Sequence, residues 1–249
     1  MNLMKGKTGL IMGVANERSI AWGIANELFL NKANIILTFQ NDSLKKRIIP
    51  LSEKVNCKNL YKCDVSLKPE NEYSIESLIE NIRKDIGDLD FVVHALAYSD
   101  KDELKGKYLQ TSRINFLSTM DISTFSFTRV AKSASKIMKN GGSLLTLTYA
   151  GSNKTTPNYN VMGVAKAALE TSVKYLSVDL GKNNIRVNAI SAGPMKTIAG
   201  AAISGARHVY RYSEKVAPLK KNPDLQQVGN AAVYLLSDIS SGVTGLTHY

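Results

Sequence analysis

The stretch that decides the fold is Lys7-Thr-Gly-Leu-Ile-Met-Gly13-Val-Ala-Asn-Glu-Arg-Ser19-Ile-Ala-Trp-Gly23. Residues 7–13 have the composition of a buried strand that ends in a glycine, and residues 19–31 have helical periodicity. Ser19 is a natural N-cap for that helix. A strand that passes through a tight turn into a helix is the first half of a βαβ unit, from which parallel sheets are built.

The same alternation of strand and helix continues along the chain. Strands separated by helices of 12 to 20 residues indicate right-handed crossovers and one parallel sheet with helices on both faces. We therefore predict an α/β protein with a single-domain, Rossmann-like, doubly wound sheet over residues 1–249, whose ligand lies at the carboxyl ends of the strands. The expected strands are 7–13, 33–39, 60–65, 89–95, 142–149, 185–191 and 243–248, and the expected helices are 19–31, 43–55, 73–85, 112–138, 160–181 and 223–237.

Length and composition limit the class of protein. The chain has 249 residues, of which 44% are hydrophobic, enough for one full core. Its apolar runs are shorter than the roughly 18 residues of a membrane span, and the N-terminus leads directly into a strand, so we expect no signal peptide. Cys57 and Cys63 are too few for a disulfide framework, which favours the cytoplasm. Metal-ligand spacing is absent from the sequence, so we expect no metal.

The chain carries a formal net charge of +11. Its lysines and arginines are scattered rather than interleaved with aromatic residues, which argues against nucleic-acid binding. The charge belongs either to a solvated, lysine-rich surface or in part to a local patch for an acidic protein partner. In such a patch Arg207 and Arg211, four residues apart, would share one helix face.

The turn after the first strand has features of a nucleotide-binding turn. It lacks the Gly-x-Gly-x-x-Gly pattern, but Gly13 can make a tight exit from the strand, and the amides around Ser19 and Ile20 would hold a pyrophosphate at the helix N-terminus. Gly23, one turn into the helix, would let the helix approach the sheet closely. The motif favours a dinucleotide, although a plain strand-turn-helix with a capping serine also explains it.

The ends of the next two strands bear on the identity of the nucleotide. An acidic residue at the end of the second strand usually binds the ribose 2′-hydroxyl, but this chain has Gln40. A neutral amide can bind a hydroxyl without forbidding a 2′-phosphate, so we favour NADH and leave NADPH open. Asp64 and Val65 end the third strand, where a carboxylate and an apolar edge suit adenine. The alternative is that Asp64 caps a helix.

A second informative stretch is Tyr149-Ala-Gly-Ser-Asn-Lys-Thr-Thr-Pro-Asn-Tyr159-Asn-Val-Met-Gly-Val-Ala-Lys166. If Tyr159 opens a helix, seven residues at about 100° each turn through about 700°, close to two full turns. The Tyr159 phenol and the Lys166 ammonium then share one face, about 10 Å apart along the axis. A phenol beside a fixed cation is a proton donor suited to an oxyanion, and with a nucleotide site it indicates an oxidoreductase.

The order of these motifs resembles a known family. The glycine turn with Ser19, then Gln40, the Asp64-Val65 pair, the tyrosines and lysine of residues 149–166, and Ser191-Ala-Gly-Pro-Met-Lys-Thr-Ile-Ala199 together look like the enoyl-acyl-carrier-protein reductases of bacterial type-II fatty-acid synthesis. These are a divergent branch of the short-chain dehydrogenase/reductases. The resemblance covers nearly the whole chain. It implies that a cytoplasmic homotetramer, without membrane or nucleic-acid partners, uses NADH to reduce the trans-2 double bond of enoyl thioesters on acyl carrier protein, the last step of the elongation cycle.

The resemblance also implies roles for individual residues. Tyr159 would bind the thioester oxygen and stabilise the enolate, Lys166 would bind the nicotinamide ribose and lend positive charge, and Tyr149 would line the acyl pocket. Residues 197–211 match a mobile flap over the substrate. The expected cofactor-binding residues are Gly13, Ala15, Ser19, Ile20, Gln40, Asp64, Val65, Ala95, Leu96, Lys166, Met195, Thr197, Ile198 and Ala199, and the expected substrate-binding residues are Ser99, Tyr149, Tyr159, Ile203 and Ala206.

Reaction chemistry agrees with the position of Tyr159. A carbonyl reductase delivers hydride to the carbon that bears the oxyanion and uses Tyr-x3-Lys, but here that position is Met162, which can do no acid chemistry. In enoyl reduction the hydride goes to the β-carbon and charge collects on the more distant carbonyl oxygen, so the donor must stand one turn further back. The rivals are a 3-ketoacyl or other carbonyl reductase and a nucleotide-sensing protein without chemistry. The second usually loses the tyrosine or the lysine.

Several positions depart from the family or have structural explanations. Ala206 stands where relatives often have a bulky aromatic residue, and the basic docking positions are partly kept as Arg207 with its neighbouring histidine. The chain ends at Tyr249, where relatives usually continue with an acidic, glycine-containing tail, so we expect an abbreviated C-terminus. His94, at a buried strand end, is expected to be structural, and Asn115 matches a position that bends a helix.

Overall fold

The computed structural model describes residues 2–201 and 205–249. One seven-stranded parallel sheet, in the order β3-β2-β1-β4-β5-β6-β7, forms its centre. Most strands are almost wholly buried, as expected for a sheet that is covered on both faces. The strands are β1 (Thr8–Met12), β2 (Asn34–Phe39), β3 (Asn59–Lys62), β4 (Phe91–His94), β5 (Gly142–Thr148), β6 (Ile185–Ser191) and β7 (Thr247–His248).

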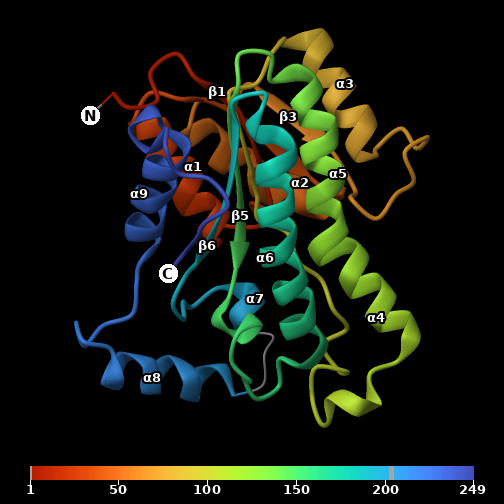
Figure 1. Cartoon of the computed structure of the whole chain (residues 1–249), viewed down its shortest axis with the longest axis vertical. Helices are drawn as coiled ribbons and strands as arrows, with labels where there is room; N and C mark the ends of the chain where they lie inside the picture. Colours follow the sequence, from red (N-terminus) through yellow and green to blue (C-terminus); the bar gives the residue numbers. More distant parts are fainter. Residues whose placement is uncertain (1, 202–204) are drawn as a thin grey trace.

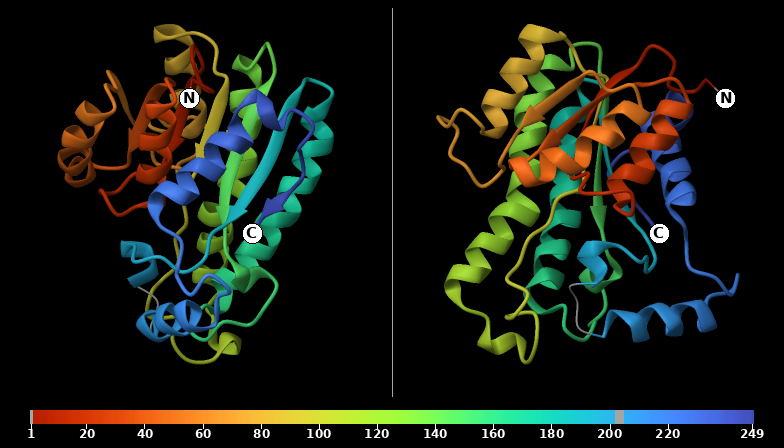
Figure 2. Two further views of the ribbon diagram at one scale, coloured as in Figure 1. Left: turned by 90° about the vertical axis from the view of Figure 1, so that its left-hand side faces the viewer. Right: turned by 180° about the vertical axis from the view of Figure 1, so that it is seen from behind.

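Helices cover both faces of this sheet, which confirms the predicted doubly wound fold (Figure 1). One core cluster joins the sheet to α1 (Ile20–Leu30), α2 (Asp42–Lys54) and α9 (Leu225–Leu236). A second cluster joins the opposite face to α3 (Ile75–Asp85), α5 (Ser126–Ala134) and α6 (Asn160–Gly181). Figure 2 shows the two helical layers from the side. Among the described residues, no helix combines the length and apolarity that a membrane crossing requires.

The strand order reverses between β1 and β4, which lie side by side in the middle of the sheet. From β1 the chain moves outward through β2 to β3, and from β4 it moves outward in the opposite direction. Ligands of such sheets bind outside the carboxyl ends of the strands at this switch point. In Figure 1, β5 points toward the end of the molecule where α7 (Ile198–Ala201) and α8 (Ala206–Val216) lie.

The predicted helical segment over residues 112–138 is continuous in the structure but changes helix type along its length. It comprises α4 (Arg113–Met120), a π-helix (Asp121–Phe125), α5 and a final 3₁₀ turn (Ser135–Ile137). The Thr124 hydroxyl donates to the Ala165 carbonyl at 2.8 Å, so the wide turn is tied to α6. The predicted long helical segment is confirmed, but its π-helical part was not predicted, because a bond to a tertiary neighbour is not revealed by periodicity.

Two predictions need correction. Gly23 does not serve the sheet: an added Cβ would lie 2.7 Å from the Leu225 carbonyl, so this glycine lets α1 pack closely on α9. The last strand is only Thr247–His248, whereas a strand over residues 243–248 was expected. Before it, the Asn188 side chain of β6 donates to the Val243 carbonyl at 2.9 Å and accepts from the Leu246 amide at 3.1 Å. Helices α7 and α8 were not expected as separate elements.

Candidate active site

Tyr159 and Lys166 are both buried near the start of α6: Lys166 lies within the helix, and Tyr159 directly precedes its first residue, Asn160, whose φ is +38°. Tyr159 is the N-cap residue of α6, and both side chains are 6% exposed. The tyrosine packs in a small apolar cluster with Met162 and Ala165, so Met162 is a core residue. Lys166 Nζ donates to the Leu147 carbonyl at 2.7 Å. Both functional groups are therefore turned inward at the carboxyl end of β5, and neither faces solvent.

Tyr149 joins this pair directly after β5. Its ring meets the Tyr159 ring edge-on, with centroids 5.1 Å apart and an interplanar angle of 68°. Gly151 makes the approach possible, since a Cβ there would lie 2.5 Å from the Tyr159 ring. The two tyrosines and the glycine thus form one packed unit in which each ring fixes the orientation of the other.

Burial sets the protonation states of the two groups. It raises the pKa of Tyr159 far above its ordinary value, and the neighbouring Tyr149 adds to the increase. Burial lowers the pKa of Lys166 to about 8, while the carboxylate of Glu170 opposes that decrease. At neutral pH the phenol therefore keeps its proton and the amine keeps its charge.

Glu170, one turn beyond Lys166, is a residue of the site that sequence reasoning missed. Its carboxylate is buried and accepts hydrogen bonds from Thr148 Oγ1 at 2.6 Å and Ser152 Oγ at 2.5 Å. It therefore ties α6 to the segment that carries Tyr149. An acidic residue four positions after a functional lysine, on the same helix face, is the signal that could have identified it.

His94 behaves as the structural residue that the sequence predicts. It is fully buried, and its ring nitrogens lie 2.8 Å from Ser126 Oγ and 3.3 Å from Thr146 Oγ1. Burial, with a smaller effect of the Lys166 charge, lowers the pKa of His94 to about 3, so the ring is neutral at physiological pH. Within the described ranges, no group of three or more His, Cys, Asp and Glu residues is placed to hold a metal ion.

The nucleotide turn lies at the switch point of the sheet. Gly13 has φ +100°, and the Ala95 carbonyl occupies the space that a Cβ at Gly13 would need, so β1 and β4 leave the sheet in contact. Helix α1 begins at Ile20 directly after this turn. Its first backbone amides, which have no partner within the helix, therefore lie at the carboxyl edge of the sheet. Ser19 occupies the N-cap position without capping: its hydroxyl donates to the Asn16 carbonyl at 2.7 Å and accepts from the Ala15 amide at 3.4 Å. The expected capping bond is wrong because the turn itself uses that hydroxyl.

Gln40 and Asp64 meet at the edge of the sheet beyond β2 and β3. Gln40 Nε2 donates to Asp64 Oδ2 at 3.1 Å, and Asp64 Oδ1 accepts from the amide of Ser66 at 3.0 Å and from its hydroxyl at 2.7 Å. Burial acts to raise the pKa of Asp64, but the hydrogen bonds from Ser66 and Gln40 outweigh it and hold the pKa below its usual range. Asp64 therefore caps a turn and not a helix, because the cap of α3 is Ser74. An ionised carboxylate beside the buried Val65 fits the adenosine half of a dinucleotide.

The segment after β4 carries Ala95, Leu96 and Ser99, and two residues of the helical segment over residues 112–138 hold it. Asn115 is buried, and its Oδ1 accepts from Ser99 Oγ at 3.3 Å and from the Asp100 amide at 2.9 Å. The Ser123 hydroxyl exchanges hydrogen bonds of 2.9 Å with the backbone of Tyr98. Asn115 therefore orders a predicted site segment as well as marking a helix bend. Ser123 was missed, although three buried hydroxyl residues at 123, 124 and 126 are an unusual sequence in a helix.

The segment that matches the flap lies at the same edge of the molecule. Met195 packs on the core, and Thr197 Oγ1 accepts from the Gly200 amide at 2.9 Å as α7 begins with Ile198 and Ala199. Ile203 lies outside the described residues, and Ala206 begins α8. The Lys196 ammonium lies 4.7 Å from the centre of the Tyr210 ring and links this segment to α8. The mobility of the flap stays a prediction.

Comparison with known proteins agrees with this geometry. The sequence model described as Enoyl-(Acyl carrier protein) reductase matches residues 13–249. Enoyl-[acyl-carrier-protein] reductase [NADH] 1 of Rhizobium meliloti (strain 1021) is 56% identical over 247 residues, which are 99% of this chain and 89% of that protein. The crystal structure of the Anaplasma phagocytophilum reductase in complex with NAD has a TM-score of 0.94 and 51% identity, and covers 99% of this chain and 92% of its own. The crystal structure of FabI from Candidatus Liberibacter asiaticus has a TM-score of 0.96 and 49% identity. The match covers 100% of this chain and 95% of that chain.

Proposed function

This chain belongs to the enoyl-(acyl carrier protein) reductase family, and from that premise we propose that it reduces the trans-2 double bond of enoyl thioesters on acyl carrier protein with NADH, the last step of fatty-acid elongation. The observation that carries the proposal is the buried phenol of Tyr159, at the N-cap of α6 and seven residues before a buried lysine on that helix. Position 162, where a carbonyl reductase needs its tyrosine, is a core methionine.

The proposed chemistry follows from where charge develops. NADH, when bound, supplies the hydride that goes to the β-carbon of the substrate. Negative charge would then collect on the thioester carbonyl oxygen, to which the Tyr159 phenol would donate a hydrogen bond. A proton from water would add to the α-carbon of this enolate and complete the reduction. A preorganised donor such as this phenol contributes on the order of 3 kcal/mol to transition-state stabilisation. Because burial holds the phenol in its protonated form, it is ready to donate at neutral pH.

Lys166 acts on the same edge as a fixed cation. It binds the ribose hydroxyls of the nicotinamide half and makes the surroundings of the phenol more favourable to an oxyanion. Its bond to the Leu147 carbonyl orients the ammonium toward the end of β5. Tyr149 lines the acyl site beside it.

The remaining cofactor and substrate positions lie along the carboxyl edge of the sheet. The helix N-terminus at Ile20 would receive the pyrophosphate, because its amides and dipole favour an anion. The adenosine half would lie at Gln40 and Asp64, where a polar pair is already formed. The residues proposed to hold the dinucleotide are Gly13, Ala15, Ser19, Ile20, Gln40, Asp64, Val65, Ala95, Leu96, Met195, Thr197, Ile198 and Ala199, and those proposed to hold the acyl chain are Ser99, Ile203 and Ala206.

The acyl carrier protein is an acidic partner, and α8 offers a basic surface to it. Arg207, Arg211 and Lys215 are exposed and follow one another at four-residue intervals, so they share a face of the helix. This helix directly follows the segment proposed as the flap. Docking there would deliver the thioester to the carboxyl edge of the sheet.

A homotetramer in the cytoplasm completes the proposal. Large apolar side chains are exposed on α4, the π-helix and α6, and exposed apolar surface can mark a protein–protein interface. Ile114, Phe125, Tyr175 and Val178 are 83%, 54%, 73% and 78% exposed. A second copy of the chain would cover them.

Substrate discrimination tests the proposed reaction. The purified protein should oxidise NADH with crotonyl thioester and leave acetoacetyl thioester unreduced, because the donor at position 159 serves a carbonyl oxygen remote from the hydride. Absorbance at the NADH band follows both reactions. Reduction of acetoacetyl thioester at the higher rate would assign the chain to the carbonyl reductases, and no turnover with either would reject an enzyme.

A further inference from the structure

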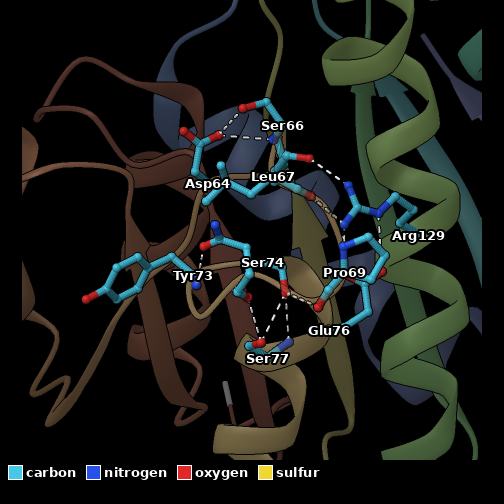
Figure 3. Close-up of polar contacts among 11 residues, drawn as sticks. Asp64, Ser66, Leu67, Pro69, Tyr73, Ser74, Glu76, Ser77 and Arg129 are labelled. Atoms are coloured by element: carbon cyan, nitrogen blue, oxygen red, sulfur yellow. Dashed lines mark hydrogen bonds and ion pairs between the residues drawn. The ribbon is translucent and has the colours of Figure 1, made fainter.

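Arg129 lies on α5, outside the proposed site, yet its side chain makes two hydrogen bonds to the segment that carries Asp64 and Val65 and two more to Glu76 in the first turn of α3. Nη1 donates to the Val65 carbonyl at 2.9 Å and Nη2 to the Leu67 carbonyl at 2.8 Å. Nε and Nη2 donate to the two carboxylate oxygens of Glu76 at 3.2 and 2.7 Å. Figure 3 shows Arg129 reaching from α5 to Leu67 and Glu76. We call these four bonds the Arg129 clamp.

The clamp holds a segment that the sheet does not hold. Strand β3 ends at Lys62, so Asp64 and Val65 lie beyond the ladder. Their turn is closed by the Leu67 amide bonding to the Asp64 carbonyl at 3.2 Å, and by the Asp64 amide bonding to the Tyr73 carbonyl at 2.9 Å. Those bonds set the local shape of the turn. Val65 also packs in the core cluster of α3 and α5, and the clamp adds hydrogen bonds from α5 to the carbonyls of Val65 and Leu67.

Burial and charge make the clamp rigid. The Arg129 side chain is 12% exposed. Its planar guanidinium binds the Glu76 carboxylate through two nitrogens, and this fixed geometry reduces the conformational entropy lost for each further hydrogen bond to a carbonyl. Burial acts to raise the pKa of Glu76, but the hydrogen bonds and charge of Arg129 outweigh it and keep the carboxylate ionised. The exposed pair Arg83–Glu80 on α3, at 3.7 Å, has neither property.

We infer that Arg129, together with Glu76, is a positioning residue for adenine recognition. It holds the Val65 carbonyl and backbone so that Asp64 faces Gln40 and the apolar side of Val65 stays at the sheet edge. Arg129 contributes to dinucleotide affinity without touching the nicotinamide half or the acyl thioester. This inference rests on the proposed function, because it deepens the adenine half of that site.

Ligand binding to Arg129→Ala tests the inference. Affinity for NADH and for ADP-ribose, measured by fluorescence and calorimetry, should fall about tenfold, which corresponds to about 1.4 kcal/mol and to the loss of buried hydrogen bonds. Affinity for reduced nicotinamide mononucleotide, which has no adenine, should stay unchanged. Maximal turnover at saturating NADH and the KM for crotonyl thioester should also stay unchanged. Glu76→Gln should act in the same direction, and Arg83→Ala is the matched control with no effect.

Several outcomes separate the possibilities. If folded Arg129→Ala binds ADP-ribose like the wild type, the inference is wrong. If it loses affinity for the mononucleotide to the same extent, the clamp acts on general stability and the inference is equally wrong. Where Arg129→Ala does not fold, Arg129→Lys, which keeps the charge on a single nitrogen, carries the same test. Wild-type protein that bound none of these ligands would reject the proposed function and this inference together, whereas the first two results reject the inference alone.

Discussion

Lys166 shows how one buried residue can set the pH range of an enzyme. Its pKa is lowered to about 8, chiefly by burial, so kcat/KM should fall as the pH rises through about 8 and the ammonium loses its proton. Unfolding does not explain such a loss. The folded pKa lies below the unfolded value of 10.5, so the unfolded chain binds more protons in this window and the contribution of Lys166 to stability increases with pH.

Lys166→Arg provides the measurement, because a guanidinium stays charged throughout this range. The variant should have a lower rate and no alkaline decline near the wild-type midpoint. An unchanged midpoint in Lys166→Arg would assign the titration to another group.

Gly151 tests the packing of the two tyrosines. A methyl group in Gly151→Ala would lie 2.5 Å from the Tyr159 ring, so we expect turnover to fall at least about tenfold and the free energy of unfolding to fall by about 1–3 kcal/mol. The control is Gly181→Ala at the end of α6, where an added Cβ meets nothing within 4 Å. That variant should be neutral or slightly more stable in denaturant titration. Equal activities of the two variants would contradict the assigned role of the packed unit.

At the scale of elements, Glu170 connects β5 and its following turn to α6. Glu170→Gln keeps an acceptor for Thr148 and removes the charge that raises the pKa of Lys166, so the alkaline decline of kcat/KM should move to lower pH. Thr148→Val keeps the charge and removes the hydrogen bond. It should leave the pH profile in place and lower stability by about 1–2 kcal/mol. Identical pH profiles for Glu170→Gln and the wild type would show that the carboxylate does not act on Lys166.

The elements also show what sequence reasoning can reach. The seven-residue step from Tyr159 to Lys166 predicts one inward face, and both residues are buried in the structure, with Tyr159 at the N-cap position of α6. The alternation of strands and helices along the sequence was sufficient to predict the parallel sheet. The π-helix and the role of Glu170 depend on hydroxyl and carboxylate bonds between elements distant in sequence, which no local period contains. Ser19 occupies the predicted N-cap position, but its hydroxyl donates to the Asn16 carbonyl in the turn. Local propensity does not reveal which of these two bonds a serine hydroxyl forms.

At the scale of the whole molecule, the exposed apolar surface of α4 and α6 predicts assembly. Val178 is 78% exposed on α6, so Val178→Asp should place a charge in the proposed contact and lower the sedimenting mass from tetramer to smaller species. Leu219 is equally exposed at 79% but lies after α8, and Leu219→Asp should leave the mass unchanged. Wild-type protein that sediments as a monomer would contradict the proposed homotetramer.

The central claim is that the phenol of Tyr159 stabilises charge on a thioester oxygen remote from the hydride. Steady-state NADH oxidation with crotonyl thioester by Tyr159→Phe tests it most directly, since the substitution removes one hydroxyl from a ring that packs against Tyr149. The rate should fall at least about tenfold with the KM for NADH unchanged, and Lys166→Ala should fall as much with a raised KM. Wild-type rates in both variants would contradict the account.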